Sequence, residues 1–403
     1  MSSLLARPLS RSDRVALENV VDRTSLGIGP WREYFFKTLR WPYDRRRRLQ
    51  LHLLRAVSAE FQLNIDSWKD FEARKPTVKA DLVGFSAHNK EGAILHQTSG
   101  SSGRPFEFFR DRILEPIDAA IFERAWSTVG RTDETVLRLV SGEPKWGYYD
   151  LLRGIYPMNY RTVNESYVTW VATHRPYIIH GVAGAIHDLV ERVWAAGHGS
   201  ALRRTALYLM SEDTQSHRKE LQGKVGRIFM GYGNSEVRTA ASECRYGTLH
   251  VNMETTIAET IDGRLHLTNL FSKTMPFVRY FTGDKGEVIQ NRRCKCGVVS
   301  DVIEGLVGKA IDYFNAPGFV RPLGWWLVSP ISHEYGEIVS AWRVEVVPGR
   351  KLIRLYVVPK TPSLEGLDPY LSWIGMNTGF TTQLISVKEL PDWREKLIRV
   401  VKS

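Results

Sequence analysis

The spacing of apolar and polar positions changes along this chain, and each spacing predicts a different kind of element. Over residues 1–90 the apolar positions recur at helical intervals, so this lead-in is predicted to be mainly helical. Between residues 112 and 230, helical patterns alternate with short apolar runs such as Val136–Val140 and Ala206–Met210. That alternation indicates an α/β architecture with mixed sheets and helices.

The C-terminal part of the chain has a different pattern. Two β-like runs, Trp342–Val347 and Leu352–Val358, flank Pro348 and Gly349 and predict a β-hairpin. A helix over residues 369–374 and a strand over residues 384–387 are expected to follow. We therefore predict a small α+β C-terminal domain after a large N-terminal domain.

A loop rich in glycine and hydroxyl side chains interrupts the apolar pattern at residues 97–105, which read Gln-Thr-Ser-Gly-Ser-Ser-Gly-Arg-Pro. Apolar runs on both sides predict a strand–loop–strand arrangement, and Pro105 prevents a helix directly after the loop. Backbone N–H groups freed by the glycines, the hydroxyls and the Arg104 guanidinium are suited to hold phosphate. A Ser/Gly-rich surface turn is the alternative interpretation of this stretch alone.

Two further stretches place a carboxylate beside a glycine turn. Within residues 229–236, glycines bracket Tyr232 and Glu236 follows. One carboxylate near a phosphate loop is sufficient for Mg²⁺, which completes its shell with water and phosphate oxygens. Within residues 277–284, Asp284 ends a β-like run at a turn, where its carboxylate can accept the hydroxyls of a ribose. Ordinary turn and capping chemistry is the simpler explanation of either stretch taken alone.

The totals of the chain restrict its class and its partners. Its 403 residues exceed one ordinary core, and 43% hydrophobic with 25% charged residues is typical of a soluble globular protein. No apolar run approaches membrane-spanning length and the N-terminus has no signal-like core, so a cytoplasmic protein without a membrane partner is expected. The net charge of +11 is dispersed except at Arg45–Arg48, which we predict to be a solvated helix face. Because no nucleic-acid motif accompanies it, nucleic acid is not an expected partner.

Three cysteines in a chain of this length exclude a disulfide framework and indicate free thiols or a metal. His250 follows Cys244 closely, and a single residue separates Cys294 from Cys296. Three thiolates and one imidazole make a closed tetrahedral Zn²⁺ site, although the spacing of Cys294 and Cys296 is tighter than the usual structural pattern. Buried thiols without a metal are the alternative.

Taken in order, three of these stretches resemble the core motifs of the adenylate-forming enzymes. They are Thr98–Pro105, Tyr232–Glu236 and Arg279–Asp284. The chain most resembles the phenylacetate-coenzyme A ligase branch and its capsule-biosynthesis-like relatives, over roughly residues 62–403. The resemblance implies an AMP-forming ligase, in which ATP and a carboxylic acid give an acyl-adenylate and pyrophosphate. A second nucleophile such as coenzyme A then displaces AMP.

The same resemblance implies roles for individual residues. The loop would hold the ATP phosphates, with Arg104 standing where the family usually has lysine, so that a fork replaces a point charge. Tyr232 would stack on adenine, Glu236 would bind Mg²⁺ and Asp284 would bind the ribose. The implied nucleotide-binding residues are Thr98, Ser99, Gly100, Ser101, Ser102, Gly103, Tyr232, Gly233, Asp284 and Lys309, and the implied catalytic residues are Lys396, Glu236 and Arg104.

Two C-terminal segments also resemble motifs of the family. Residues 390–400 resemble its closing motif and put Lys396 at the catalytic lysine. Residues 308–312 occupy its hinge, with Lys309 in place of the usual arginine and Ile311 in place of the first acidic residue. These matches imply an ATP- and substrate-binding domain over residues 1–307 and a small mobile domain over residues 308–403.

We therefore predict a ligase that uses ATP and Mg²⁺, carries a structural Zn²⁺ and activates a small-molecule carboxylic acid. Apolar residues around Ile179–Val182 and Phe229–Met230 favour an aryl or other apolar acid, although the same residues would serve as core. Three alternatives stay open: a nucleotidyltransferase that leaves AMP on its substrate, a ligase with an amine or other non-thiol acceptor, and a degenerate nucleotide-binding regulator. The sequence does not give the oligomeric state, and a homodimer is one of the states it allows.

Overall fold

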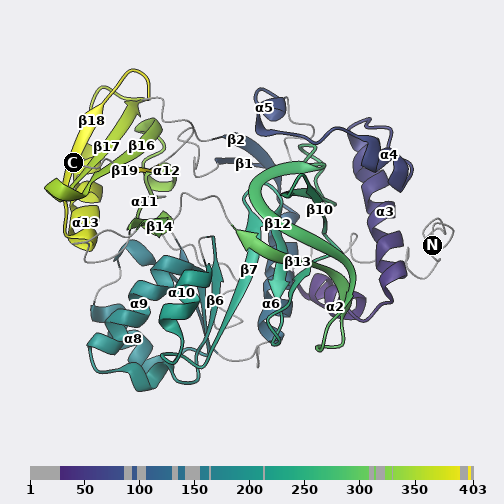
Figure 1. Ribbon diagram of the computed structural model, residues 1–403, viewed down its shortest axis with the longest axis horizontal. Coiled ribbons are helices and arrows are strands. Elements are labelled where there is room, and N and C mark those ends of the chain that lie inside the picture. Colours follow the sequence, from purple (N-terminus) through teal and green to yellow (C-terminus); the bar gives the residue numbers. More distant parts are fainter. Residues whose placement is uncertain are drawn as a thin grey trace. The chain divides into compact units, whose positions relative to one another are not determined.

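The structure is a computed structural model that describes residues 28–85, 93–97, 106–128, 135–140, 155–162, 165–211, 214–307, 313–314, 323–328, 330–390 and 398–400. The chain divides into two compact units, each of which combines helices with strands (Figure 1). Unit 1 comprises residues 1–96, 108–134 and 229–307, and unit 2 comprises residues 97–107, 135–228 and 308–403. The predicted α/β class is confirmed. Among the described residues, no helix is both long enough and apolar enough to cross a membrane.

Helices α2 (Ile28–Thr38), α3 (Tyr43–Glu60), α4 (Trp68–Ala73) and α6 (Leu114–Ser127) of unit 1 pack around a core of aromatic and aliphatic side chains. The short helix α5 (Lys79–Leu82) belongs to the same unit. Trp31 and Phe35 of α2 are fully buried, with ring centres 5.8 Å apart, and Leu49 and Leu54 of α3 are fully buried in the same core. Burial of one apolar face on each helix, rather than intrinsic propensity, therefore stabilises this part of the chain.

Two arginines of α3 are buried in unit 1. Arg46 is 1% exposed and Arg47 is 7% exposed, so the prediction of a solvated helix face at Arg45–Arg48 is wrong for these two residues. The Arg47 guanidinium lies 3.6 Å from the ring centre of Trp68. Burial lowers the pKa of Arg46, and the nearby Glu254 opposes that shift. Partners distant in sequence thus allow both charges to lie in the interior.

Unit 1 also contains an antiparallel sheet with the strand order β10-β11-β12-β13-β9-β8-β7. The two longest strands, β12 and β13, form a curved hairpin (Figure 1). The strands are β7 (Arg227–Asn234), β8 (Arg238–Glu243), β9 (Leu249–Val251), β10 (Thr256–Ile261), β11 (Arg264–Asn269), β12 (Tyr280–Arg293) and β13 (Val299–Val307). A separate pair, β1 (Ala93–Gln97) and β2 (Glu107–Asp111), lies on either side of the glycine-rich loop, as the strand–loop–strand pattern predicts.

Arg279 joins this sheet to the helical lead-in of unit 1. It precedes β12, has a left-handed backbone (φ 51°) and is 7% exposed. Its guanidinium forms a two-pronged ion pair with Glu259 on β10 (3.1 and 3.0 Å). The same group donates to the carbonyl oxygens of Phe71 (3.2 Å), Glu72 (2.6 Å) and Arg74 at the C-terminal end of α4. A planar fork with five N–H donors is required for this set of partners.

Replacement of Arg279 by alanine is expected to destabilise the protein by up to about 3 kcal/mol, because it leaves the partly buried Glu259 carboxylate and three main-chain carbonyls without their partner. Arg279→Lys should keep only part of the stability, since an ammonium group cannot reproduce the fork. Urea unfolding measures both effects. Arg55→Ala, which removes an exposed arginine that also donates to a main-chain carbonyl, is the control and should change little. Equal midpoints for Arg279→Lys and the native protein would contradict this account.

Unit 2 contains a parallel sheet with the strand order β6-β5-β3-β4. Helix α9 packs on β5 and β6, and α8 and α10 pack on α9 (Figure 1). The strands are β3 (Val136–Val140), β4 (Ile155–Asn159), β5 (Ile178–Val182) and β6 (Ala206–Met210). The helices are α8 (Glu165–His174), α9 (Ala183–Ala195) and α10 (Thr214–Leu221), with short 3-10 turns at Tyr160–Thr162 and Gly199–Leu202.

The C-terminal residues of unit 2 form a second sheet with the order β18-β17-β16-β19. Strands β16 (Val339–Val347) and β17 (Leu352–Pro359) form the predicted antiparallel hairpin, and β18 (Thr381–Ser386) and β19 (Ile398–Val400) pair parallel to it. Helix α13 (Asp368–Thr378) contacts β18. The shorter elements are β14 (Tyr313–Phe314), β15 (Leu323–Gly324), α11 (Trp325–Val328), α12 (Pro330–Glu334) and 3-10 turns at Pro348–Arg350 and Glu365–Leu367.

The two sheets of unit 2 share one hydrophobic core. Leu327 and Val328 of α11 are fully buried, and α11 contacts α9. Arg161, just after β4, pairs with Glu334, and its guanidinium lies 5.3 Å from the ring centre of Tyr335. Residues 308–403 therefore pack with residues 135–228 in the same unit. The division into domains 1–307 and 308–403 stays a prediction, although one border of unit 1 does fall after residue 307.

Candidate functional site

The β7–β8 hairpin of unit 1 carries three of the predicted site residues. Tyr232 and Gly233 lie on β7, and Glu236 lies in the turn before β8. The pairing of the two strands shifts register between Tyr232 and Gly233. Any side chain at position 233 would collide with the main-chain carbonyl of Arg238, so the backbone here admits only glycine. Gly233 thus has a packing role that is independent of ligand binding.

Strand β12 brings a fourth predicted residue, Asp284, to this hairpin. The Tyr232 hydroxyl donates to Oδ2 of Asp284 (2.9 Å). The Tyr280 hydroxyl, also from β12, donates to Oε1 of Glu236 (2.9 Å). Two tyrosine–carboxylate pairs therefore connect the two motif stretches. Both carboxylates are only partly buried and can meet a ligand. Tyr232 is 8% exposed and Tyr280 is 4% exposed.

Both tyrosine hydroxyls of these pairs remain protonated across the physiological pH range. Burial, followed by the charge of Asp284, raises the pKa of Tyr232 well above its ordinary value. Burial, followed by the charge of Glu236, raises the pKa of Tyr280 in the same way. Each tyrosine is thus a permanent hydrogen-bond donor to its carboxylate. Of the two, Tyr280 lies inside a motif stretch but was assigned no role from the sequence.

The hairpin is anchored to α6 through an ion pair. Arg238, which has a left-handed backbone (φ 72°), pairs with Asp118 of α6, and the N–H of Thr239 donates to Oδ1 of the same aspartate (3.4 Å). Arg110 of β2 lies close to this group, and burial together with the charge of Arg238 lowers its pKa to about 10. Strand β2, helix α6 and the hairpin therefore converge here, which fixes the turn that carries Glu236.

The remaining predicted catalytic and phosphate-binding residues lie outside the described part of the chain. They are Thr98, Ser99, Gly100, Ser101, Ser102, Gly103, Arg104, Lys309 and Lys396.

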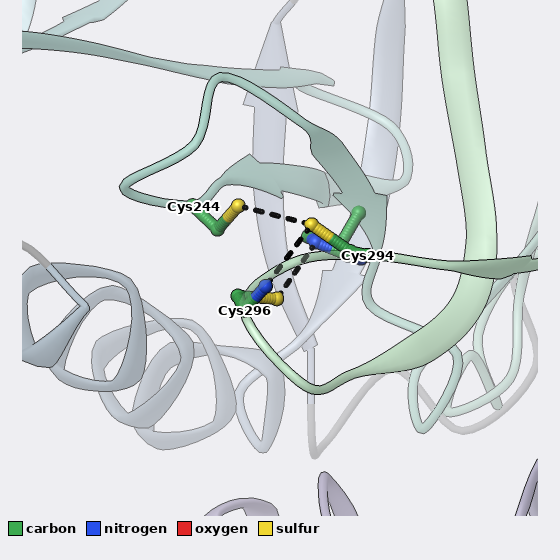
Figure 2. A group of neighbouring side chains, drawn as sticks. Cys244, Cys294 and Cys296 are labelled. Carbon is green, nitrogen blue, oxygen red and sulfur yellow. Dashed lines mark hydrogen bonds between the residues drawn. The ribbon is translucent and has the colours of Figure 1, made fainter.

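A second cluster in unit 1 consists of the three cysteines and His250. The four ligand atoms all lie within 4.8 Å of one another. Figure 2 shows the sulfur atoms of Cys244 and Cys294 facing each other, at 3.7 Å, with Cys296 beside them. Sγ of Cys296 lies 3.4 Å from Nε2 of His250. Two sulfurs bound to one Zn²⁺ at ~2.3 Å each would lie ~3.8 Å apart in tetrahedral geometry, so this donor set fits that ion.

Two turns of similar geometry present the sulfur atoms of Cys244 and Cys294. In the first, the N–H of Tyr246 donates to Cys244 Sγ (3.4 Å), and in the second the N–H of Cys296 donates to Cys294 Sγ (3.5 Å). Each turn has a glycine with positive φ three residues after the cysteine, Gly247 (76°) and Gly297 (89°). Backbone donors aimed at sulfur stabilise the thiolate form, which is the form that binds metal.

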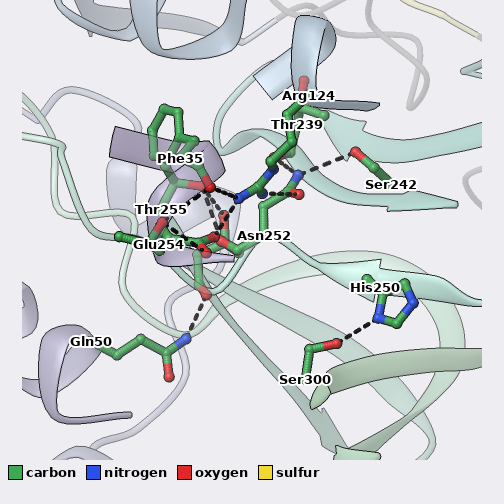
Figure 3. Close-up of polar contacts among 12 residues, drawn as sticks. Phe35, Gln50, Arg124, Thr239, Ser242, His250, Asn252, Glu254, Thr255 and Ser300 are labelled. Atoms are coloured by element: carbon green, nitrogen blue, oxygen red, sulfur yellow. Dashed lines mark hydrogen bonds and ion pairs between the residues drawn. The ribbon is translucent and has the colours of Figure 1, made fainter. Parts of the chain in front are cut away.

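The imidazole of His250 is oriented by a buried hydroxyl. Figure 3 shows Ser300 beside Nδ1 of His250, at a distance of 2.6 Å, which leaves Nε2 directed to the cysteines. Burial, with the nearby charges of Arg46 and Arg124, lowers the pKa of His250 to about 4, so the ring is neutral near pH 7.

The wider surroundings of this histidine form a buried polar network (Figure 3). Arg124 of α6 donates to Asn252 Oδ1 (2.8 Å) and pairs with Glu254 (3.1 Å). Thr38 of α2 donates to the other oxygen of Glu254 (3.2 Å). Arg124 of this network is close enough for its charge to act on His250, so the histidine of the cysteine cluster has buried polar surroundings.

No family model and no curated protein matches the chain. Solved structures do match it. One is a crystal structure of 2-hydroxyisobutyryl-CoA ligase in complex with 2-HIB-AMP and CoA in the thioesterification state. It is 15% identical to this chain with a TM-score of 0.60, and the match covers 89% of this chain and 90% of that one. The same ligase in the postadenylation state, in complex with R3-HIB-AMP, gives a TM-score of 0.58 at 15% identity and the same coverage. This chain has the fold of an adenylate-forming coenzyme A ligase.

The ligase fold confirms the predicted architecture, in which a large α/β domain is combined with a smaller C-terminal domain. Within it, Tyr232, Glu236 and Asp284 come together although 48 residues separate the two carboxylates in the sequence. At 15% identity the likeness concerns the fold alone, and the resemblance to the phenylacetate-coenzyme A ligase branch stays a prediction.

Proposed function

We propose that this protein is an AMP-forming ligase that activates a carboxylic acid as an acyl-adenylate and passes the acyl group to a second nucleophile such as coenzyme A. The observation that carries the proposal is the pair of tyrosine–carboxylate hydrogen bonds that joins the hairpin of Tyr232 and Glu236 to the strand of Asp284, in a chain with the ligase fold. An aryl or other apolar acid is the proposed substrate class. The phenylacetate-coenzyme A ligase-like branch is the proposed relationship.

Each residue of this group has a role that suits its chemistry. Glu236 would hold Mg²⁺, a hard cation that takes one or two carboxylates and leaves the rest of its shell to water and phosphate. Bound there, the ion would supply charge neutralisation on the phosphates. Asp284 would bind the ribose hydroxyls, and Tyr232 would pack against adenine. The glycine-rich loop with Arg104 and the C-terminal Lys396 would complete the site, as the resemblance implies.

ATP–pyrophosphate exchange with a panel of carboxylic acids tests this proposal. Acid-dependent exchange is expected, together with AMP release when coenzyme A is added. Exchange with AMP retained on a macromolecule or sugar would favour a nucleotidyltransferase, and exchange followed by transfer to an amine would favour a non-thiol acceptor. ATP binding without exchange for any acid would overturn the proposal and favour a nucleotide-binding regulator.

Different kinetic defects are expected from the two carboxylates. Glu236→Gln keeps the shape but removes the charge, so it should raise the Mg²⁺ concentration that supports half-maximal exchange. Asp284→Ala removes the proposed ribose contact and should mainly raise the KM for ATP. Separate Mg²⁺ and ATP titrations measure the two effects. Superimposable titrations for the native protein and both variants would contradict the assignment.

We further propose that Cys244, His250, Cys294 and Cys296 bind one structural Zn²⁺. The donor set supports this assignment, because three sulfurs and one imidazole nitrogen fill a tetrahedral shell and leave no position for substrate. The ion would join the turn after β8, strand β9 and the turn between β12 and β13. Its contribution would therefore be to the stability of unit 1, with no part in the reaction.

A further inference from the structure

The carboxylate of Glu236 is held from one side only. Its Oε1 accepts the hydrogen bond of Tyr280 (2.9 Å), and among the described residues no hydrogen bond or ion pair engages Oε2. When one oxygen of a carboxylate is held by a hydrogen bond, the position of the other oxygen is fixed as well. Mg²⁺ needs such fixed oxygen ligands, because it binds only in nearly ideal octahedral geometry.

The Tyr280 ring cannot easily move away from Glu236. It is 4% exposed and packs edge-to-face on Phe277 (ring centres 5.4 Å apart), which packs in the same way on Phe108 of β2 (5.6 Å). The three packed rings connect β2, which directly follows the glycine-rich loop, to the Tyr280 hydroxyl that donates to Glu236. The ring position is thus set by packing and not by the hydrogen bond itself.

The backbone at Tyr280 is fixed as well. The N–H of Thr77 donates to the carbonyl of Arg279 (3.2 Å), and the carbonyl of Thr77 accepts from the N–H of Phe281 (2.9 Å). Thr77 therefore holds both neighbours of Tyr280 in a parallel bridge. Arg279 is itself held by Glu259 and by the end of α4. The hydroxyl of Tyr280 consequently lies at a place that several independent contacts define.

We infer that Tyr280 is a positioning residue for Glu236, which orients the carboxylate so that Oε2 meets Mg²⁺ on the bound nucleotide. This inference rests on the proposed function. Tyr280 itself would touch neither the metal nor the nucleotide. A hydrogen bond from a neutral donor that keeps its proton also leaves the full negative charge on the carboxylate, which the cation needs. Partners of this kind behind a metal ligand commonly change metal affinity by about 10–100-fold.

The test is ATP binding, measured by calorimetry over a series of Mg²⁺ concentrations, with Tyr280→Phe as the variant. Phenylalanine keeps the packed ring and removes only the hydroxyl. We expect the Mg²⁺ concentration that gives half of the gain in ATP affinity to rise about 10–100-fold, while ATP binding without Mg²⁺ stays as in the native protein. Tyr43→Phe is the matched control. It removes a similar bond, from the Tyr43 hydroxyl to Asp301 (2.6 Å), in the same unit, and should leave the Mg²⁺ series unchanged.

A double variant separates positioning from a general loss of structure. If Tyr280 acts through Glu236, adding Tyr280→Phe to Glu236→Gln should cause no further change in the Mg²⁺ series. Additive effects, or an unchanged series for Tyr280→Phe alone, would overturn the inference while leaving the proposed function intact. If the native protein binds ATP equally well with and without Mg²⁺, or does not bind ATP, both the inference and the Mg²⁺ role in the proposed function are wrong.

Discussion

Protein purified without added metal should contain about one zinc ion per chain, and Cys294→Ser should lose the ion and unfold at a much lower temperature. Structural Zn²⁺ contributes about 10–16 kcal/mol of apparent binding free energy in zinc-finger peptides, so its loss should exceed the effect of most single substitutions. In this chain the ion would close a loop of 50 residues between Cys244 and Cys294.

Elemental analysis and thermal melting with and without a chelator are the measurements. A second test variant is His250→Asn, and His266→Asn is its matched control. Both rings are buried in the sheet of unit 1, but Nδ1 of His266 lies 3.1 Å from the carbonyl of Arg264 and the ring is not part of the cysteine cluster. Only His250→Asn should lower the zinc content. Folded, active protein without zinc would refute the metal assignment.

Lys396→Ala should lower the rate of ATP–pyrophosphate exchange by on the order of 10²–10³-fold. The proposed reason is that one positioned cation neutralises charge that develops on the α-phosphate during attack by the carboxylate. ATP binding in the absence of the acid should be retained, because the defect concerns the transition state. Rapid-quench or steady-state exchange assays give the rate, and calorimetry gives the binding.

Lys388→Ala is the control for Lys396. It removes an exposed lysine of the same C-terminal segment and should leave the exchange rate unchanged. A Lys396→Ala variant with native exchange would eliminate the assigned role, and a loss of the same size in both variants would indicate an effect of net charge alone.

The C-terminal hairpin and the cysteine cluster could be predicted from the sequence because their signals are local or rare. The β16–β17 hairpin follows from two β-like runs around a turn. Cys244, Cys294 and Cys296 could be grouped because they are the only cysteines of the chain, and one histidine lies near the first. In both cases a few residue types restrict the possible structures strongly.

The features that could not be predicted from the sequence depend on contacts between segments distant in the chain. Tyr280 and Glu236 are 44 residues apart, and their hydrogen bond requires β12 to lie against the β7–β8 turn, which no local pattern encodes. The burial of Arg46 likewise depends on Glu254, which lies more than 200 residues later in the sequence, between β9 and β10. A run of four arginines has the same sequence whether its side chains are solvated or buried, so charge alone led to the wrong prediction of a solvated face.

The shared core of unit 2 limits the ways in which this protein can change shape. Leu327 and Val328 lie fully buried in the core that also contains α9, and re-exposure of such side chains to water costs about 1.5–3 kcal/mol each. A swing confined to residues 308–403 would have to break this core and release Arg161 from Glu334. The parallel sheet and the C-terminal sheet therefore cannot separate without exposing these side chains to water, and they belong to one folded unit.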